Sequence, residues 1–417
     1  MIHVIGGGLA GSEITYQLAT RGYKVVLHEM RPKVESGVHK TDKFAELVCS
    51  NSLKSMDPVK NASGVLKKEL EELDSFVLKV AEKHAIPGGK ALVVDREAFS
   101  EEITHTLKEM PNVIIKREEV KFIPKDDDIW IVASGPATSQ NLYTWLENEF
   151  GRGAHFFDAV SPVITAESID MSKAFFANRY DEEGSDYLNC PMNKEEYLAF
   201  RATLVNAEVL PVEGFDKKLL FSRCQPIEEI ARSGVDAMRY GPLRPVGLSK
   251  NGKRYYAVVQ LRRDDSVGSL YNLVGFQTRL KWPEQDKVIH MIPGLEKAKI
   301  VRYGVMHANI YLEPNATMDD YFRAKKDKRI FFAGQIIGVE GYVESIASGL
   351  FTAINVIRIQ KEMDPITLPT DTMIGALLDY VRKTKDLKPM YANFGIIKRD
   401  EVRSIPTLEH FLARGLD

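Results

Sequence analysis

The first thirty residues of this chain show two short apolar runs separated by a helical pattern. Ile2–Ile5 forms the first run, which is typical of a strand buried on both faces of a parallel sheet. Ala10, Ile14 and Leu18 then recur at the spacing of one helix face, and residues 24–28 form a second apolar run. This pattern predicts a strand–helix–strand unit at the start of the chain.

Similar patterns continue to about residue 180. Asp95 stands where a helix N-cap is expected, because the apolar residues after it recur every four positions. We expect short strands at residues 113–115 and 120–122. A longer apolar run begins at Asp128 and ends in Ala-Ser-Gly-Pro. That ending resembles the Ala-Thr-Gly segment that passes close to the cofactor in flavoproteins with two dinucleotide-binding domains.

The character of the chain changes between about residues 181 and 315. Strand-like segments at residues 255–261 and 272–276 alternate there with loops rich in Pro, Gly and Arg, which predicts a second, mixed domain. An apolar strand leading into glycines returns at residues 329–338. A helix follows, with Ile346, Leu350, Ile354 and Ile357 on one face.

Composition narrows the class of protein. The 417 residues suffice for two or three domains, and 44% hydrophobic with 27% charged residues is ordinary for a globular protein. No apolar run approaches the about 20 residues of a membrane-spanning helix. The first strand begins at once, so no leader peptide is expected before it. Three widely spaced cysteines without a CxxC pair argue against a disulfide scaffold and a zinc site. We therefore expect a cytoplasmic protein with no bound metal and no membrane contact.

Glycines between the first strand and the first helix indicate a dinucleotide site. Gly6 allows a tight turn, Gly8 lets the backbone approach a pyrophosphate, and Gly11 lets the helix pack on the strand. The helix N-terminus then offers N–H groups to phosphate oxygens, and Glu29 can accept hydrogen bonds from ribose hydroxyls. The residues expected to bind the cofactor are Gly6, Gly7, Gly8, Leu9, Ala10, Gly11, Glu29, Gly334 and Gln335.

The late strand and its glycines favour FAD over a nicotinamide cofactor alone. We predict an α/β fold with a Rossmann-like FAD-binding domain of the glutathione-reductase type and an inserted mixed α+β domain. The FAD-binding domain comprises residues 1–180 and 316–417, and the inserted domain, expected to face the substrate or RNA, comprises residues 181–315.

Longer segments resemble one family of RNA-modifying enzymes. Residues 44–55 and 332–345 are similar to hallmarks of the tRNA uridine-modifying flavoproteins. The match narrows through residues 187–192, 239–248, 275–282, 291–296, 301–307 and 388–395. Together they resemble the methylenetetrahydrofolate- and FAD-dependent tRNA (uracil-5-)-methyltransferases, from residue 1 to about residue 395. A related carboxymethylaminomethyl-uridine enzyme shares the fold, but it carries a long helical C-terminal domain for which we expect no room here.

The resemblance implies the reaction and its residues. It implies 5-methyluridine formation in the tRNA T loop, with methylenetetrahydrofolate as carbon donor and NADH or NADPH as reductant through FAD. Cys49 and Cys224 align with the two functional cysteines of the family: Cys224 would act on the uracil ring and Cys49 at the flavin. Arg223 stands where the family more usually has an acidic residue. The positive charge of Arg223 would lower the pKa of the Cys224 thiol. Cys190 is expected to be a buried hydrophobic residue.

Further candidates follow from the chemistry. His307 and Tyr342 are expected to stack on the folate, although both could be packing residues. A net charge of −2 gives no overall signal for RNA, so binding would need local basic clusters, with Arg244, Lys250 and Arg262 as candidates. Three alternatives stay open: the same chemistry on ribosomal RNA, an FAD-dependent NAD(P)H oxidase or disulfide reductase, and a flavin-bound RNA chaperone without catalysis. The oligomeric state is not predicted.

Overall fold

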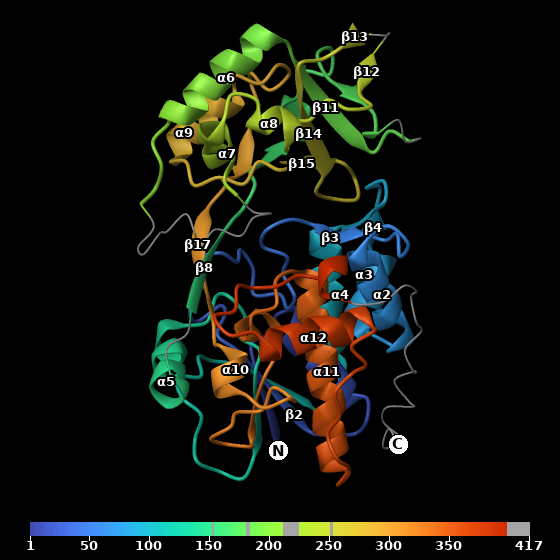
Figure 1. Ribbon diagram of the computed structural model, residues 1–417, viewed down its shortest axis with the longest axis vertical. Helices are drawn as coiled ribbons and strands as arrows, with labels where there is room; N and C mark the ends of the chain where they lie inside the picture. Colours follow the sequence, from blue (N-terminus) through green and yellow to red (C-terminus); the bar gives the residue numbers. More distant parts are fainter. Residues whose placement is uncertain (152–153, 181–183, 212–224, 251–252, 398–417) are drawn as a thin grey trace.

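The computed structural model describes residues 1–151, 154–180, 184–211, 225–250 and 253–397. Two bodies lie one above the other in Figure 1, each with a sheet and a core of its own. Two long strands, β8 (Ala154–Ala159) and β17 (Met306–Tyr311), run between the bodies and pair with each other in antiparallel fashion. The upper body is therefore an insertion in the chain of the lower one.

The lower body is built on a five-stranded parallel sheet. Its strands, in order across the sheet, are β18 (Ile330–Phe332), β7 (Ile129–Val132), β1 (Ile2–Ile5), β2 (Val25–Glu29) and β6 (Val113–Arg117). All four neighbouring pairs are parallel, with Val4 opposite Leu27 on one side and Ile131 on the other. The apolar runs of these strands are buried because helices and loops cover both faces of a parallel sheet.

Helices from both ends of the chain cover this sheet. They are α1 (Leu9–Ala19), α2 (Ala62–Glu72), α3 (Phe76–Lys83), α4 (Arg96–Glu109), α5 (Gln140–Phe150), α10 (Pro314–Thr317), α11 (Tyr342–Gln360) and α12 (Met373–Lys383). α1 and α11 pack very closely, because a Cβ atom on Gly349 would lie 2.8 Å from the carbonyl oxygen of Ala10. Helices from the N-terminal part of the chain and from its last third thus pack against each other in the lower body.

Shorter elements complete the lower body. They are the three-stranded sheet of β3 (Ser52–Ser55), β5 (Ala91–Val94) and β4 (Ala85–Ile86), and the short turns η3 (Gly334–Ile337) and η4 (Phe394–Ile396). This small sheet lies beneath the upper body in Figure 1.

The upper body is a six-stranded antiparallel sheet with helices. The strand order is β10 (Phe175–Phe176), β11 (Tyr187–Met192), β14 (Ala257–Arg263), β15 (Leu270–Leu273), β9 (Val163–Thr165) and β16 (Ile300–Arg302). The other elements are η1 (Ala166–Ser168), α6 (Lys194–Asn206), α7 (Ile227–Ser233), α8 (Ala237–Tyr240), α9 (Trp282–Ile289) and the hairpin of β12 (Ser249–Lys250) and β13 (Lys253–Arg254). Its core runs from Ile164 to Ala298, and the predicted domain boundaries near residues 180 and 316 stay a prediction.

Most predicted elements are confirmed. The strand–helix–strand start is present, and the Asp95 carboxylate accepts hydrogen bonds from the backbone N–H groups of Glu97 and Ala98 as the N-cap of α4. The α/β class with a parallel sheet is also confirmed. The strand predicted at residues 120–122 is wrong: the segment pairs with no strand in the described chain, and Phe122 is 60% exposed.

Candidate functional site

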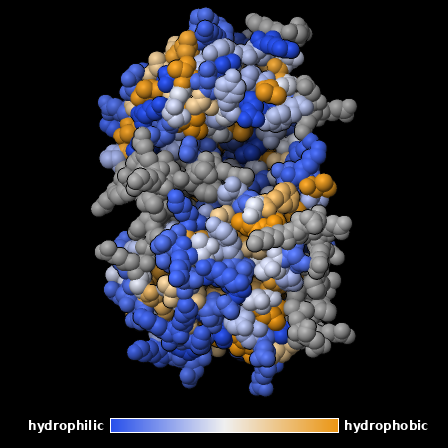
Figure 2. All heavy atoms as spheres, in the orientation of Figure 1, coloured by the Kyte–Doolittle hydropathy of each residue, from blue (hydrophilic) through white to orange (hydrophobic). Residues whose placement is uncertain are grey.

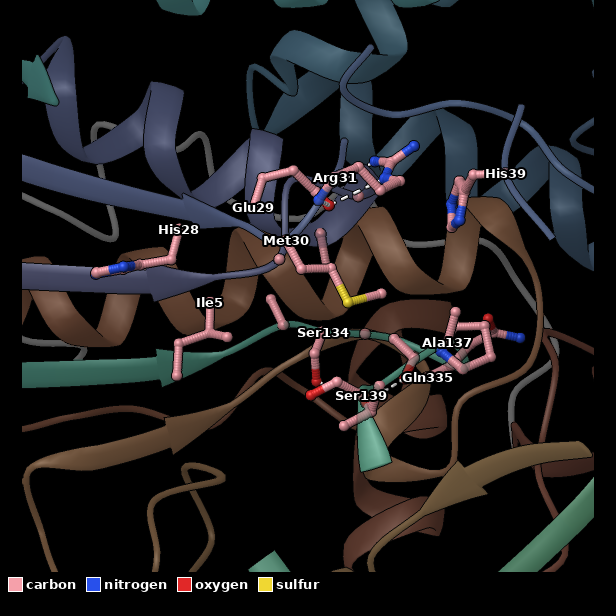
Figure 3. A pocket seen from close by; sticks show the side chains of 18 of the residues that line it. Ile5, His28, Glu29, Met30, Arg31, His39, Ser134, Ala137, Ser139 and Gln335 are labelled. Atoms are coloured by element: carbon pink, nitrogen blue, oxygen red, sulfur yellow. Dashed lines mark hydrogen bonds and ion pairs between the residues drawn. The ribbon is translucent and has the colours of Figure 1, made fainter. Parts of the chain in front are cut away.

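A cleft opens at the carboxyl ends of β1, β2 and β7, where ligands bind in open α/β sheets. The cleft is open to solvent, and Ile5, Glu29 and Ala133 line it at the ends of these strands. Figure 3 shows two walls: Glu29, Arg31 and His39 lie on one side, and Ser134, Ala137 and Gln335 on the other. Seven of the nine residues expected to bind the cofactor line this cleft, among them Gly334 and Gln335 of the late segment, whereas Gly7 and Gly11 are not among its lining residues.

Each glycine of the first turn meets a different steric demand. Gly6 has φ +102°, a left-handed conformation that favours glycine. A Cβ on Gly11 would collide with the carbonyl oxygen of Gly6, so glycine is needed where α1 crosses β1. A Cβ on Gly8 would meet no atom within 4 Å, so this position opens directly onto the cleft. The turn is built for close approach of a ligand at Gly8.

The start of α1 suits an anionic ligand. Gly8 is the N-cap and provides no side-chain cap, and the first turn has no acidic residue. Backbone N–H groups at a helix N-terminus attract phosphate oxygens. Leu9 and Ala10, in that first turn, line the cleft. This end of the cleft can therefore hold a pyrophosphate.

Glu29 is fixed at the end of β2 by Arg31. Its carboxylate accepts hydrogen bonds from the backbone N–H of Gly7 at 3.0 Å and from the guanidinium of Arg31 at 2.9 and 3.1 Å. Burial alone would raise the pKa of Glu29, but the hydrogen bonds and charge of Arg31 lower it below the usual range. Glu29 is therefore an ionised acceptor at the edge of the cleft, as the ribose interaction requires.

The late segment closes the cleft from the opposite side. Gly334 has φ +78°, and its N–H donates to the hydroxyl of Ser348 at 2.8 Å, which fixes the turn on α11. Gln335 and Ser345 face the same cleft as Gly8. Two helix N-termini and two glycine turns converge on one cavity, and this donor set fits the pyrophosphate and ribitol of FAD.

Tyr342, the first residue of α11, joins the cleft to the loop that carries Cys49. Its hydroxyl accepts hydrogen bonds from the backbone N–H of Cys49 at 2.8 Å and of Ser50 at 3.1 Å. Val48 and Tyr342 both line the cleft, and Cys49 is partly buried. The residue before the predicted flavin-side cysteine thus lines the cleft, and the role of Cys49 and the stacking of Tyr342 on folate stay predictions.

The remaining residues singled out in the sequence are Cys190, expected to be buried, the folate candidate His307, and Cys224 with its neighbour Arg223. Cys190 is fully buried in the upper core, and burial raises the pKa of its thiol to about 12. His307 lies in β17, opposite Asp158 of β8, but its side chain is outside the described part. Cys224 and Arg223 also lie outside the described residues. Their roles stay predictions.

The three RNA candidates are distributed differently. Arg244 is partly exposed and donates to the hydroxyl of Tyr180 at 3.1 Å, while Lys250 ends β12. Arg262 is only 8% exposed, and its guanidinium donates to Asn51 at 3.1 Å and Asn272 at 3.3 Å. The prediction that Arg262 contacts RNA is therefore corrected: its position on the inner side of β14 turns it into the protein.

The sequence analysis did not identify the residues that hold Glu29 and the loop around Cys49 in place. Arg31 could have been found, because a cation two residues after an acid at a strand end is a local signal. Asn51, Arg96 and Asp264 gave no such signal, since their contacts join segments far apart in the chain.

The surface shows no membrane-spanning or metal-binding feature in the described residues. None of their helices is long and apolar enough to cross a membrane, and they contain no group of His, Cys, Asp and Glu suited to a metal. On the face shown in Figure 2, hydrophobic residues form small separate patches among hydrophilic ones.

The chain is similar to known proteins along nearly its full length. A family model described as glucose inhibited division protein A matches residues 1–364. A protein of Pseudothermotoga lettingae named methylenetetrahydrofolate–tRNA-(uracil-5-)-methyltransferase TrmFO is 56% identical, over 99% of this chain and 96% of its own. Proteins of the same name from Thermotoga maritima and Thermosipho africanus are 56% and 52% identical, over 97% and 96% of this chain and 93% and 95% of their own.

Solved structures agree on the fold. Two crystal forms of Aquifex aeolicus GidA superpose with TM-scores of 0.71 and 0.72. They are 16% and 18% identical, over 99% of this chain and 72% and 74% of their own. At this identity the likeness concerns the fold alone.

Proposed function

This chain belongs to the family of the methylenetetrahydrofolate–tRNA-(uracil-5-)-methyltransferases TrmFO, and from that premise we propose that it methylates carbon 5 of a T-loop uridine in tRNA. Methylenetetrahydrofolate supplies the carbon, and NADH or NADPH supplies electrons through FAD. The observation that supports the proposal is the hydrogen bond from the backbone N–H of Cys49 to the hydroxyl of Tyr342, because Tyr342 lines the dinucleotide cleft.

The reaction needs both a thiol and two electrons. Carbon 5 of uracil is a weak nucleophile until a group adds at carbon 6, and a thiolate is well suited to that addition. The methylene carbon is at the oxidation level of formaldehyde, so a methyl group requires two further electrons. A bound flavin supplies redox chemistry of this kind. We assign the addition at carbon 6 to Cys224 and the handling of the methylene carbon to Cys49.

The residues of the chain bind and orient the reactants. The first turn of α1 and the residues after Gly334 would hold the phosphates and ribitol of FAD by their N–H groups, and Glu29 would accept from the ribose. Tyr342 holds the backbone at Cys49, and we assign stacking on the folate to His307 and Tyr342. Gln335 lines the wall opposite Glu29.

The RNA is held by phosphate contacts and gives up one base to the cleft. Arg244 and Lys250 lie in the upper body, and we assign them phosphate contacts. The target base leaves its stack to reach the cysteines. We also assign the enzyme to the cytoplasm, where tRNA and reduced nicotinamide are both present.

Methyl transfer to a T-loop transcript tests the proposal. Product should require methylenetetrahydrofolate and NADH or NADPH together, and omission of either should abolish it. A ribosomal RNA transcript with a uridine loop serves as the second substrate, and we expect it to stay unmodified. Formation of 5-methyluridine with S-adenosylmethionine as the only carbon donor would overturn the proposal, as would hydrogen peroxide formation without any RNA product.

A further inference from the structure

The loop that carries Cys49 is held at both ends as well as at its centre. Tyr342 binds the two N–H groups at the centre. At one end, the guanidinium Nη1 of Arg96 donates to the carbonyl oxygen of Leu47 at 2.6 Å. At the other end stands Asn51, which is fully buried. Irregular backbone is thus fixed on both sides of a reactive side chain.

Asn51 uses the whole hydrogen-bonding capacity of its amide. Its Nδ2 donates to the carbonyl oxygens of Val94 at 3.1 Å and Arg263 at 2.8 Å. Its Oδ1 accepts from Nε of Arg262 and from Nδ2 of Asn272, both at 3.1 Å. Three of these four partners belong to the upper body, so hydrogen bonds from the upper body hold this end of the loop.

Asp264 connects the two ends of the loop. Its Oδ1 accepts from Nε and Nη2 of Arg96 at 3.1 and 2.8 Å, and from Nδ2 of Asn272 at 3.1 Å. The side chains of Arg96 and Asp264 are 9% and 4% exposed. Burial alone would raise the pKa of Asp264, but the charges of Arg96 and Arg302 lower it, so the pair is ionised.

The sheet geometry brings these groups together. Arg262 in β14 lies opposite Asn272 in β15, and Asp264 directly follows the end of β14. Neighbouring strands therefore present three polar side chains toward one loop of the lower body. A buried ion pair is weak evidence for stability, because apolar residues of similar volume serve that purpose as well. What this network provides is a defined position for the loop.

We infer that Asp264, together with Arg96 and Asn51, positions the Cys49 loop for reaction, so that the sheet of the upper body sets the geometry of the thiol in the lower one. The inference rests on the proposed function, because it takes Cys49 as a reacting thiol. Asp264 touches neither substrate nor cofactor in this scheme. It acts through Arg96 on the backbone at Leu47 and through Asn272 on Asn51.

The substitution Asp264→Asn tests the inference in the flavin-loaded protein. It keeps the size of the side chain, but it removes the charge that orients Arg96. We expect kcat for methyl transfer to fall about tenfold to a hundredfold, because small misplacements of reacting groups have effects of that size. The KM for tRNA and the flavin content should stay within about twofold. Iodoacetamide labelling of Cys49, followed by mass spectrometry of its peptide, should become at least about fivefold faster as the loop loosens.

Asp186→Asn is the matched control. Asp186 accepts a hydrogen bond from the backbone N–H of Gly89 at 2.8 Å, so it also joins the upper body to the lower one, but it does not contact the Cys49 loop. This variant should keep the wild-type kcat and labelling rate. Equal effects of Asp186→Asn and Asp264→Asn would overturn the inference, because loosening of the whole interface would then explain both.

A second variant covers failure of Asp264→Asn to fold. Arg96→Lys keeps the charge, but it lacks the planar fork whose separate nitrogens donate to Leu47 and Asp264, and it should show the same fall in kcat and the same faster labelling. Wild-type rates in a folded Arg96→Lys or Asp264→Asn variant would overturn the inference and leave the proposed function intact. Conversely, a wild-type protein without methyl transfer, but with faster Cys49 labelling in Asp264→Asn, would refute the function and not the positioning.

Discussion

The hydroxyl oxygen of Tyr342 accepts a hydrogen bond from the backbone N–H of Cys49 at 2.8 Å, across a separation of 293 residues. The first turn of α11 is thereby tied to the loop before β3. Burial, reinforced by the nearby Cys49 thiol, raises the pKa of Tyr342 well above its usual range. The hydroxyl is therefore protonated at neutral pH, and it remains a donor as well as an acceptor.

Tyr342→Phe should slow methyl transfer and leave the flavin bound. The variant removes the acceptor of two partly buried N–H groups, and such a loss corresponds to about 1–3 kcal/mol, or roughly tenfold to a hundredfold in rate if it falls on the reacting geometry. Turnover and visible flavin absorbance are the measurements. Tyr380→Phe in α12 removes a hydroxyl outside the cleft and should change neither. An unchanged kcat in Tyr342→Phe would show that this contact does not matter to the reaction.

Alanine substitutions of the three cysteines should have different effects on methylation and stability. Cys49→Ala and Cys224→Ala should each abolish methylation while the yellow flavin stays bound. Cys190→Ala should keep turnover, but it should lower the free energy of unfolding by about 1–2 kcal/mol, because a small cavity opens in the upper core. Chemical denaturation and methyl transfer provide the two readouts. Full turnover by Cys49→Ala or Cys224→Ala would refute the assignment of that residue.

Gly8→Ala and Gly11→Ala should fail for different reasons. The new methyl group at Gly8 meets no protein atom within 4 Å, so the apoprotein should keep its thermal midpoint and lose flavin affinity by about tenfold or more. The methyl group at Gly11 collides with Gly6, so that variant should unfold at lower temperature even without flavin. Flavin titration and thermal melts of the apoprotein distinguish the two. Wild-type flavin affinity in Gly8→Ala would argue against phosphate binding at this turn.

The burial of Lys67 leads us to expect that the stability of the protein depends on pH. It is 1% exposed, its Nζ donates only to oxygens of Ser55 and Ser63, and burial lowers its pKa from 10.5 to about 7. Between these pH values the unfolded chain binds more protons, so the cost of burying this ammonium is full below about pH 7 and declines as the pH rises toward 10.5.

Comparison with Lys67→Met isolates this effect. The free energy of unfolding of the wild type, relative to the variant, should increase with pH across that window, by at most about 1.4 kcal/mol per pH unit. Urea denaturation at several pH values measures the difference. Lys68→Met is the control, because Lys68 is exposed and pairs with Glu71. If the difference in free energy of unfolding between the wild type and Lys67→Met does not change with pH, Lys67 is charged in the folded protein throughout this range.

Binding of tRNA should weaken with salt. Arg244→Ala should lower the affinity for all tRNA sequences alike and reduce the slope of log affinity against log salt by about 1. Fluorescence anisotropy at several salt concentrations gives that slope. Lys108→Ala, on α4 of the lower body, is the control and should keep it. An affinity independent of salt would refute the phosphate contacts altogether.

Local patterns predicted the parts of the fold that local physics determines. The apolar run at Ile2–Ile5, the glycine turn and the Asp95 cap each depend on residues a few positions apart, and all three are present. The cleft followed from them, because the carboxyl ends of parallel strands and the start of α1 meet there.

Tertiary relationships were beyond the reach of such patterns. Arg262 looked like a surface cation in a basic segment, but Asn51, 211 residues away, provides its buried acceptor. Lys67 is a buried cation in α2, and three oxygens around it allow its burial. Phe122 stands in the segment Val120-Lys121-Phe122, which pairs with no strand in the described chain. The buried acceptor of Arg262 is distant in the chain, whereas the oxygens around Lys67 come from residues four and twelve positions away.

The pairing of β8 with β17 has a consequence for biosynthesis. By the time a ribosome has added Tyr311, the upper core, from Ile164 to Ala298, has all of its residues. The flavin cleft at that moment still lacks β18 and the start of α11, with Gly334, Gln335 and Tyr342. All residues of the upper core are thus on the nascent chain before the last residues of the cofactor cleft, so the flavin site becomes complete only late in synthesis.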